Sequence, residues 1–227
     1  MTPLTTEAQS VKTKLDIADS LFGARRYTQS LELYKDIYNS GDASPAMLLK
    51  MAYSEEAQEN LGNALVYLHD YYRFTSDDKA LDKMDELAQV NALQGYNETD
   101  FEQAEKVLND FRYIIFIILI LLSSVVFFMM FRKYKKHDER SLGLATSFAL
   151  TLALAIYILD FTSENDKGII MNNDTFIMSG PSAASELVEV VGQGHKIEVV
   201  GKKDIWIEIY WRGKRAFVRE NNLQELL

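Results

Sequence analysis

The sequence predicts a multidomain membrane protein that consists of an all-α repeat domain, a two-helix transmembrane hairpin and a small all-β barrel. Three observations predict this class. Apolar residues recur at helical spacing over about residues 8–95. Two long apolar runs follow, from Tyr113 to Phe131 and from Leu142 to Leu159. Short β-type runs separated by turns then fill residues 168–227. The predicted segments are 1–110 (helical repeats with a capping helix), 111–131 (first membrane helix), 132–141 (basic loop), 142–160 (second membrane helix) and 161–227 (β barrel).

The N-terminal segment contains an internal repeat. Ser30 and Ala64 occupy equivalent positions in two similar stretches that lie 34 residues apart, which is the period of the tetratricopeptide repeat. That repeat needs small residues where its two helices cross, and Ala18, Ser30, Ala52 and Ala64 fill those positions. The segment therefore resembles a tetratricopeptide-like array over residues 11–76, with residues 77–95 as a cap. A generic antiparallel helical bundle remains the alternative.

A repeat array of this kind implies a partner-binding surface. The first helix of each unit would line a concave face. The residues that we expect on this face are Lys12, Leu15, Asp19, Phe22, Leu49, Tyr53 and Glu56.

The two apolar runs have the length and composition of membrane-spanning helices. The first is about 21 residues long, which at a rise of about 1.5 Å per residue matches a hydrocarbon core of about 30 Å. The second run carries Ala145, Ala149 and Ala153 at intervals of four, so that they share one helix face. Such a face allows another helix to approach closely. Alternatively, the small residues fill this span without a dedicated partner.

The charge distribution around these runs predicts their orientation. Five of the nine residues from Arg132 to Arg140 are Lys or Arg, and basic loops stay in the cytoplasm. We therefore expect the loop 132–141 in the cytoplasm and both flanking domains outside the inner membrane. The first residues, Met1–Glu7, lack the basic and apolar parts of a signal peptide, so a signal was either removed ahead of Met1 or not used.

The C-terminal segment resembles a bacterial SH3 domain. The resemblance rests on the stretches 176–182, 194–197, 206–209 and 213–218 in that order. It departs from that family at Met178, where a basic residue is usual, and at Ala216 and Phe217, which replace a Gly-Trp pair. The aromatic residues Trp206, Tyr210, Trp211 and Phe217 either form the core of this domain or line a shallow groove for a peptide or a glycan.

The order of the segments, taken over the full chain, resembles the Bacteroides aerotolerance protein E group. This resemblance implies a membrane-bound adaptor in a bacterial envelope complex. It also implies partners among von Willebrand factor A-type membrane proteins and a MoxR-type ATPase system. The alternative is a protein that binds or senses peptidoglycan through its SH3-like domain.

The remaining composition argues against catalysis and against nucleic acid as a partner. The chain has no cysteine, and its three histidines lie far apart, so that neither a thiolate nucleophile nor a common zinc motif is present. The formal net charge of −9 disfavours binding to phosphate backbones. We therefore predict a non-enzymatic protein without cofactor or metal, whose partners are envelope proteins and the lipid bilayer.

Overall fold

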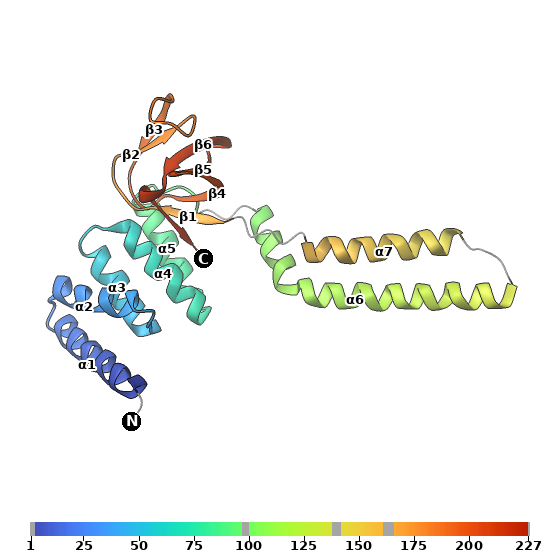
Figure 1. Cartoon of the computed structure of the whole chain (residues 1–227), viewed down its shortest axis with the longest axis horizontal. Helices are drawn as coiled ribbons and strands as arrows, with labels where there is room; N and C mark the ends of the chain where they lie inside the picture. Colours follow the sequence, from blue (N-terminus) through green and yellow to red (C-terminus); the bar gives the residue numbers. More distant parts are fainter. Residues whose placement is uncertain (1–2, 97–99, 138–141, 161–165, 227) are drawn as a thin grey trace. The chain divides into compact units, whose positions relative to one another are not determined.

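The computed structural model describes residues 3–96, 100–137, 142–160 and 166–226, which form two compact units (Figure 1). The first unit combines the N-terminal helices with the C-terminal sheet, and the second lies between them in the sequence. The two ends of the chain therefore build one body, although more than sixty residues separate them.

Five helices make up the N-terminal part of the first unit. They are α1 (Pro3–Gly23), α2 (Tyr27–Asn39), α3 (Pro45–Glu56), α4 (Leu61–Thr75) and α5 (Lys79–Val90). Helix α3 begins at a favourable start signal, because the Ser44 side chain accepts a hydrogen bond from Met47 N and Pro45 occupies the first turn. Left-handed residues, among them Arg25 and Glu59, reverse the chain between successive helices.

Small side chains are buried where the helices pack in pairs, α1 with α2 and α3 with α4. These buried small residues are Ala18, Ser30, Ala52 and Ala64. Large side chains fill the rest of this core, with Tyr34, Leu48 and Leu65 fully buried. Helical periodicity in the sequence corresponds to this burial: the large buried residues of α2, Leu31, Tyr34 and Ile37, follow one another at intervals of three.

The C-terminal part of the first unit is a seven-stranded antiparallel sheet. Its strands are β1 (Lys167–Ile170), β2 (Thr175–Met178), β3 (Leu187–Val191), β4 (Lys196–Lys203), β5 (Trp206–Trp211), β6 (Lys214–Arg219) and β7 (Leu223–Leu226), in the order β3-β2-β6-β5-β4-β1-β7. The inner face carries an aliphatic core that includes Ile177, Ile207 and Ile209. Strand alternation explains this core, because residues two apart share a face.

Glycines allow the helices and the sheet to pack together. A Cβ atom on Gly62 of α4 would lie 3.0 Å from the carbonyl oxygen of Ile170 in β1. Just after α5, Lys196 N donates to Gln94 O at 3.0 Å, and Tyr96 Oη donates to Gly194 O at 2.8 Å. The sheet is therefore attached to the helices by hydrogen bonds as well as by apolar packing.

The second unit contains helices α6 (Asp100–His137) and α7 (Leu142–Asp160), which pack against each other. Within α6, the segment Tyr113–Lys133 is long and apolar enough to cross a membrane, and only 6% of its most apolar stretch is buried. The segment Leu142–Ile158 of α7 is apolar but shorter. Part of the predicted basic loop 132–141 continues α6 as far as His137, and positions 138–141 lie outside the described residues.

The predicted fold class is wrong. The described residues form seven α-helices and one seven-stranded antiparallel sheet, and one of the helices is long and apolar enough to span a membrane. This arrangement replaces the predicted tetratricopeptide-like domain, two-helix transmembrane hairpin and separate small SH3-like barrel. The sheet is not an independent barrel, because β1 and β7 pack against α4 and the helical core includes Ile169 of β1.

Candidate partner-binding site

A partly exposed aromatic cluster joins the first three helices. Phe22 of α1, Tyr27 at the start of α2 and Tyr53 of α3 lie edge to face. Their ring centroids are 5.3 Å (Phe22–Tyr27), 5.8 Å (Phe22–Tyr53) and 5.4 Å (Tyr27–Tyr53) apart. Edge-to-face contacts between aromatic rings are favourable. Because Tyr53 remains 52% exposed, this cluster is an ordered apolar surface that an incoming side chain can reach.

Charged residues flank the aromatic cluster. Lys50 Nζ lies 2.8 Å from Asp19 Oδ1 and 5.9 Å from the centroid of the Phe22 ring. Tyr34 Oη donates a hydrogen bond of 2.6 Å to the same carboxylate. Burial tends to raise the pKa of Asp19, but the hydrogen bonds from Lys50 and Tyr34 outweigh it and hold the pKa below its usual value. Asp19 therefore stays ionised and ties α1 to α2 and α3.

A second charged group extends this surface to α5. Lys83 Nζ lies 3.0 Å from Glu56 Oε1 and 3.4 Å from Glu86 Oε1. Burial tends to lower the pKa of Lys83, but the two carboxylates outweigh it and raise the pKa. We use the name helical face for the surface formed by Asp19, Phe22, Tyr27, Lys50, Tyr53, Glu56 and Lys83.

The residues predicted for a partner-binding surface are distributed as follows. Asp19, Phe22, Tyr53 and Glu56 belong to the helical face. Lys12 and Leu49 are exposed on α1 and α3, and Leu15 packs against the helical core. Sequence reasoning missed Tyr27, Lys50 and Lys83. Opposite charges on α1 and α3 (Asp19 and Lys50) and on α3 and α5 (Glu56 and Lys83) could have indicated two of these residues.

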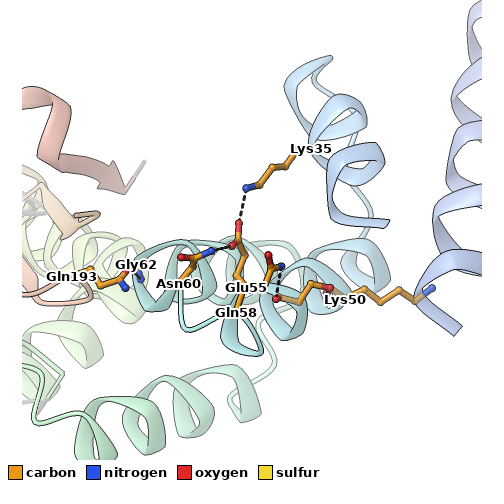
Figure 2. A network of polar contacts seen from close by, with 8 residues as sticks. Lys35, Lys50, Glu55, Gln58, Asn60, Gly62 and Gln193 are labelled. Carbon is orange, nitrogen blue, oxygen red and sulfur yellow. Dashed lines mark hydrogen bonds and ion pairs between the residues drawn. The ribbon is translucent and has the colours of Figure 1, made fainter. Parts of the chain in front are cut away.

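A buried carboxylate, that of Glu55, lies at the end of α3, where Lys35 and Asn60 approach it (Figure 2). Glu55 is fully buried, with Oε1 2.7 Å from Lys35 Nζ and Oε2 accepting a hydrogen bond of 2.9 Å from Asn60 Nδ2. The contact with Lys35 is close, but its angles are not those of a hydrogen bond. The backbone N–H of Asn60 also donates to Glu55 O, at 2.9 Å. Glu55 thus fixes the turn between α3 and α4 and links it to α2.

The same turn is attached to the sheet. Gln193 Nε2, from the turn between β3 and β4, donates to Glu59 O at 2.8 Å. In return, Gly62 N donates to Gln193 Oε1 at 3.4 Å, and Figure 2 shows Gln193 reaching Gly62 next to the Glu55 group. Through these hydrogen bonds, Gln193 connects the sheet to the turn between α3 and α4.

The aromatic residues predicted to line a groove in the β segment lie on both faces of the sheet. Trp211 is buried with Ile209 in the core, and its Nε1 donates a hydrogen bond of 2.7 Å to Glu189 Oε2. Trp206 is also buried, and the Arg219 guanidinium lies 5.5 Å from its ring centroid. The other two rings, Tyr210 and Phe217, are exposed and partly buried, respectively. The two tryptophans therefore do not offer an open platform for a glycan.

The small-residue face of α7 points away from α6. Ala145, Ala149 and Ala153 are all exposed, whereas Ala155 is fully buried. Phe148 packs against Phe127 of α6, with ring centroids 5.6 Å apart. Close packing between α6 and α7 therefore involves the face of Phe148 and Ala155, and the predicted face of three alanines is left free in this unit.

No protein-family model matches the chain, and no curated protein matches it significantly. Within the described ranges, His, Asp and Glu side chains form no group of three or more that could hold a metal ion. The helical face, with its aromatic cluster and the charged pairs beside it, is the candidate functional site.

Proposed function

We propose that this protein is a non-enzymatic membrane adaptor that holds protein partners in a bacterial envelope complex through its helical face. The observation that carries the proposal is the aromatic cluster of Phe22, Tyr27 and Tyr53, bordered by the ion pairs Lys50–Asp19 and Lys83–Glu56. Ordered aromatic rings with a polar border are the usual anchors of protein interfaces. A partner would place an apolar side chain against the exposed ring of Tyr53.

The charges of the helical face support binding rather than chemistry. Asp19 is engaged by Lys50 and Tyr34, and Lys83 is engaged by two carboxylates. A general acid or base needs a pKa close to the working pH, whereas the pKa of Asp19 is lowered and that of Lys83 is raised, both away from neutrality. These groups are suited to fixing the orientation of a partner.

We further propose that the protein is located in the bacterial inner membrane, as a multi-pass protein with both ends in the periplasm. Chain connectivity supports this orientation. Residues from both sides of α6 and α7 build the first unit, so a chain that leaves through α6 has to return to the same side. The apolar segment of α7, Leu142–Ile158, is close to the minimum of about 17 residues that a crossing requires. The basic positions 132–140 would then remain in the cytoplasm.

The partners that we propose are envelope proteins, and the resemblance noted above implies von Willebrand factor A-type membrane proteins and a MoxR-type ATPase system. Binding of peptidoglycan through the sheet has less support, because Trp206 and Trp211 are buried.

The test compares two exposed aromatic residues in the full chain. Tyr53→Ala removes a ring of the helical face, whereas Phe74→Ala removes an exposed ring of α4, which lies outside it. Complexes are purified from native membranes and quantified by mass spectrometry. We expect Tyr53→Ala to reduce partner recovery at least tenfold and Phe74→Ala to leave it unchanged. Equal recovery with both variants would refute the proposal, as would sedimentation of the protein with purified cell wall that depends on Tyr210.

A further inference from the structure

Strand β3 is an edge strand of the sheet. In the described part of the chain it pairs with β2 alone, whereas the strand at the other edge, β7, packs against α4. The backbone groups along the outer side of β3 therefore have no neighbouring strand. An unpaired edge of this kind is a template for a further strand.

The surface beside this edge is apolar. Phe176 of β2 pairs with Val190 of β3, and their side chains are 56% and 44% exposed. A register shift places Leu187 and Val188 together opposite Met178, and both are about half exposed. We use the name β3 edge patch for Phe176, Leu187, Val188 and Val190. Contiguous exposed apolar residues of this kind mark interaction surfaces.

The charged residue of β3 leaves the edge open. Lysine and proline are common devices that prevent edge strands from pairing, and β3 contains neither. Its single charged residue, Glu189, lies on the core face opposite Ile177, and its charge is compensated there, because its carboxylate accepts hydrogen bonds from Trp211 Nε1 at 2.7 Å and Arg212 Nη2 at 2.8 Å. Val188 and Val190 therefore remain uncovered.

Carboxylates stand at both ends of β3. Glu186 precedes the strand directly. Asp174 precedes β2, and because Thr175 pairs with Val191, it lies near the far end of β3. Both carboxylates are exposed. An incoming segment therefore meets an apolar centre with an acidic group at either end.

We propose that β3 binds an extended segment of a partner protein, which has apolar side chains at alternate positions and Lys or Arg at its ends. The segment adds a strand to the sheet, so that its backbone pairs with β3 and its apolar side chains cover Phe176 and Val190. Opposite charges at the two ends, toward Glu186 and Asp174, set the position of the segment.

The charges favour such a segment over a second copy of this chain or a membrane. An antiparallel pair of β3 strands centred on Glu189 would bring Glu186 of one copy near Asp174 of the other. Two chains with a net charge of −9 also repel each other. Anionic lipid surfaces attract basic segments and would be repelled by these carboxylates.

A peptide probe tests the proposal on the full chain in detergent micelles. The probe is Lys-Val-Thr-Val-Thr-Val-Lys with a fluorescent label, and binding is followed by fluorescence anisotropy. We expect this peptide to bind at least tenfold more tightly than the same peptide with glutamate at both ends. Two further peptides carry methyl groups on alternate backbone nitrogens, one on the odd and one on the even positions. The peptide whose methylated nitrogens would face β3 should not bind, whereas the other peptide should bind like the unmethylated one. Equal binding of both peptides, or no binding up to about 1 mM, would overturn the proposal.

Variants of the protein locate the bound peptide. The double change of Phe176→Ser and Val190→Ser should weaken binding of the lysine-flanked peptide at least tenfold. Val200→Ser, which replaces an exposed valine of β4, should not weaken it. Glu186→Lys should weaken it severalfold. Equal effects of the β3 and β4 changes would place the binding elsewhere and overturn the proposal.

A cysteine test addresses the second copy. The chain contains no cysteine, so that Val188→Cys and Val190→Cys each introduce a single thiol. An antiparallel pair of β3 strands centred on Glu189 would place these two positions opposite each other. We expect a mixture of the two variants to form little disulfide-linked dimer on oxidation. Efficient dimer formation would identify a second copy as the occupant and overturn the proposal.

Discussion

The backbone of Gly95 lies against the carbonyl group of Lys196 so closely that a Cβ atom on Gly95 would stand 1.9 Å from the Lys196 oxygen. The neighbouring residues pair around this contact, because Lys196 N donates to Gln94 O at 3.0 Å. Gly95 also has a φ of +90°, which L-residues rarely adopt. This contact is therefore specific to glycine, and it joins the end of the helical part to the sheet.

We predict that Gly95→Ala destabilises the first unit by about 3 kcal/mol, because left-handed strain adds to the clash with Lys196. Gly41→Ala is the matched control, since Gly41 has the same φ of +90° but a Cβ atom added to it would meet no atom within 4 Å. It should cost only about 1 kcal/mol. Urea unfolding of the full chain in detergent can be followed through Trp206 and Trp211, the two tryptophans of the sequence. Similar costs for both changes would contradict a close contact at Gly95.

The Lys35–Glu55 pair should respond unequally to loss of its two members. Lys35→Met leaves a fully buried carboxylate without its cation and should cost about 3 kcal/mol. Glu55→Gln leaves a partly exposed lysine, which can turn to water, and should cost about 1 kcal/mol. The same urea experiment measures both values, and a larger cost for Glu55→Gln would contradict a buried charge at this position.

The elements that the sequence predicted best are those with a strong period. Leu31, Tyr34 and Ile37 are buried along α2 as helical spacing predicts, and Ile207 and Ile209 share the core face of β5 as strand alternation predicts. The predicted fold class failed because a different kind of contact decides it. The joint between helices and sheet rests on backbone atoms beside Gly62 and Gly95, and such contacts leave no periodic pattern in the sequence.

The helical face could be predicted only in part for a related reason. Asp19 and Phe22 follow from their spacing along one helix. Lys50 and Lys83, in contrast, belong to the face because of contacts with other helices. Lys50 of α3 meets Asp19 of α1, and Lys83 of α5 meets Glu56 of α3. Such pairings depend on how neighbouring helices are placed in three dimensions, and a single sequence does not specify that placement.

Stability should fall as the pH is lowered, because of His69. Burial, together with the nearby charges of Lys196, Arg73 and Lys167, lowers the pKa of His69 to about 4, from 6.5. Between these values the unfolded chain binds a proton that the folded chain does not, so stability decreases as pH falls below about 6.5. From pH 7 to pH 5 we expect a loss of about 1 to 2 kcal/mol through this group, given its partial exposure.

The check is urea unfolding at pH 7 and pH 5 for the wild type and for His69→Gln, with tryptophan fluorescence as the signal. The variant should lose less stability than the wild type over this range. His195 adds to the slope in both proteins, since burial lowers its pKa and its Nδ1 accepts a hydrogen bond of 3.0 Å from Gln94 N. Parallel pH dependences would show that His69 protonates equally in the folded and unfolded chain.

The packing of α7 on α6 should depend on Ala155 and not on Ala153. Ala155 is fully buried in a unit where α6 is the helix packed against α7, whereas Ala153 is exposed. Ala155→Leu would therefore overpack the contact, at a cost of about 1 to 3 kcal/mol, and Ala153→Leu would add an exposed side chain without strain.

Because the chain lacks cysteine, Phe127→Cys and Phe148→Cys together provide one thiol on each helix at a site where the native rings lie 5.6 Å apart. A short bifunctional thiol reagent should cross-link α6 to α7 efficiently in this background and in its Ala153→Leu version, but poorly in its Ala155→Leu version. Equal yields in all three proteins would mean that Ala155 does not lie in the contact.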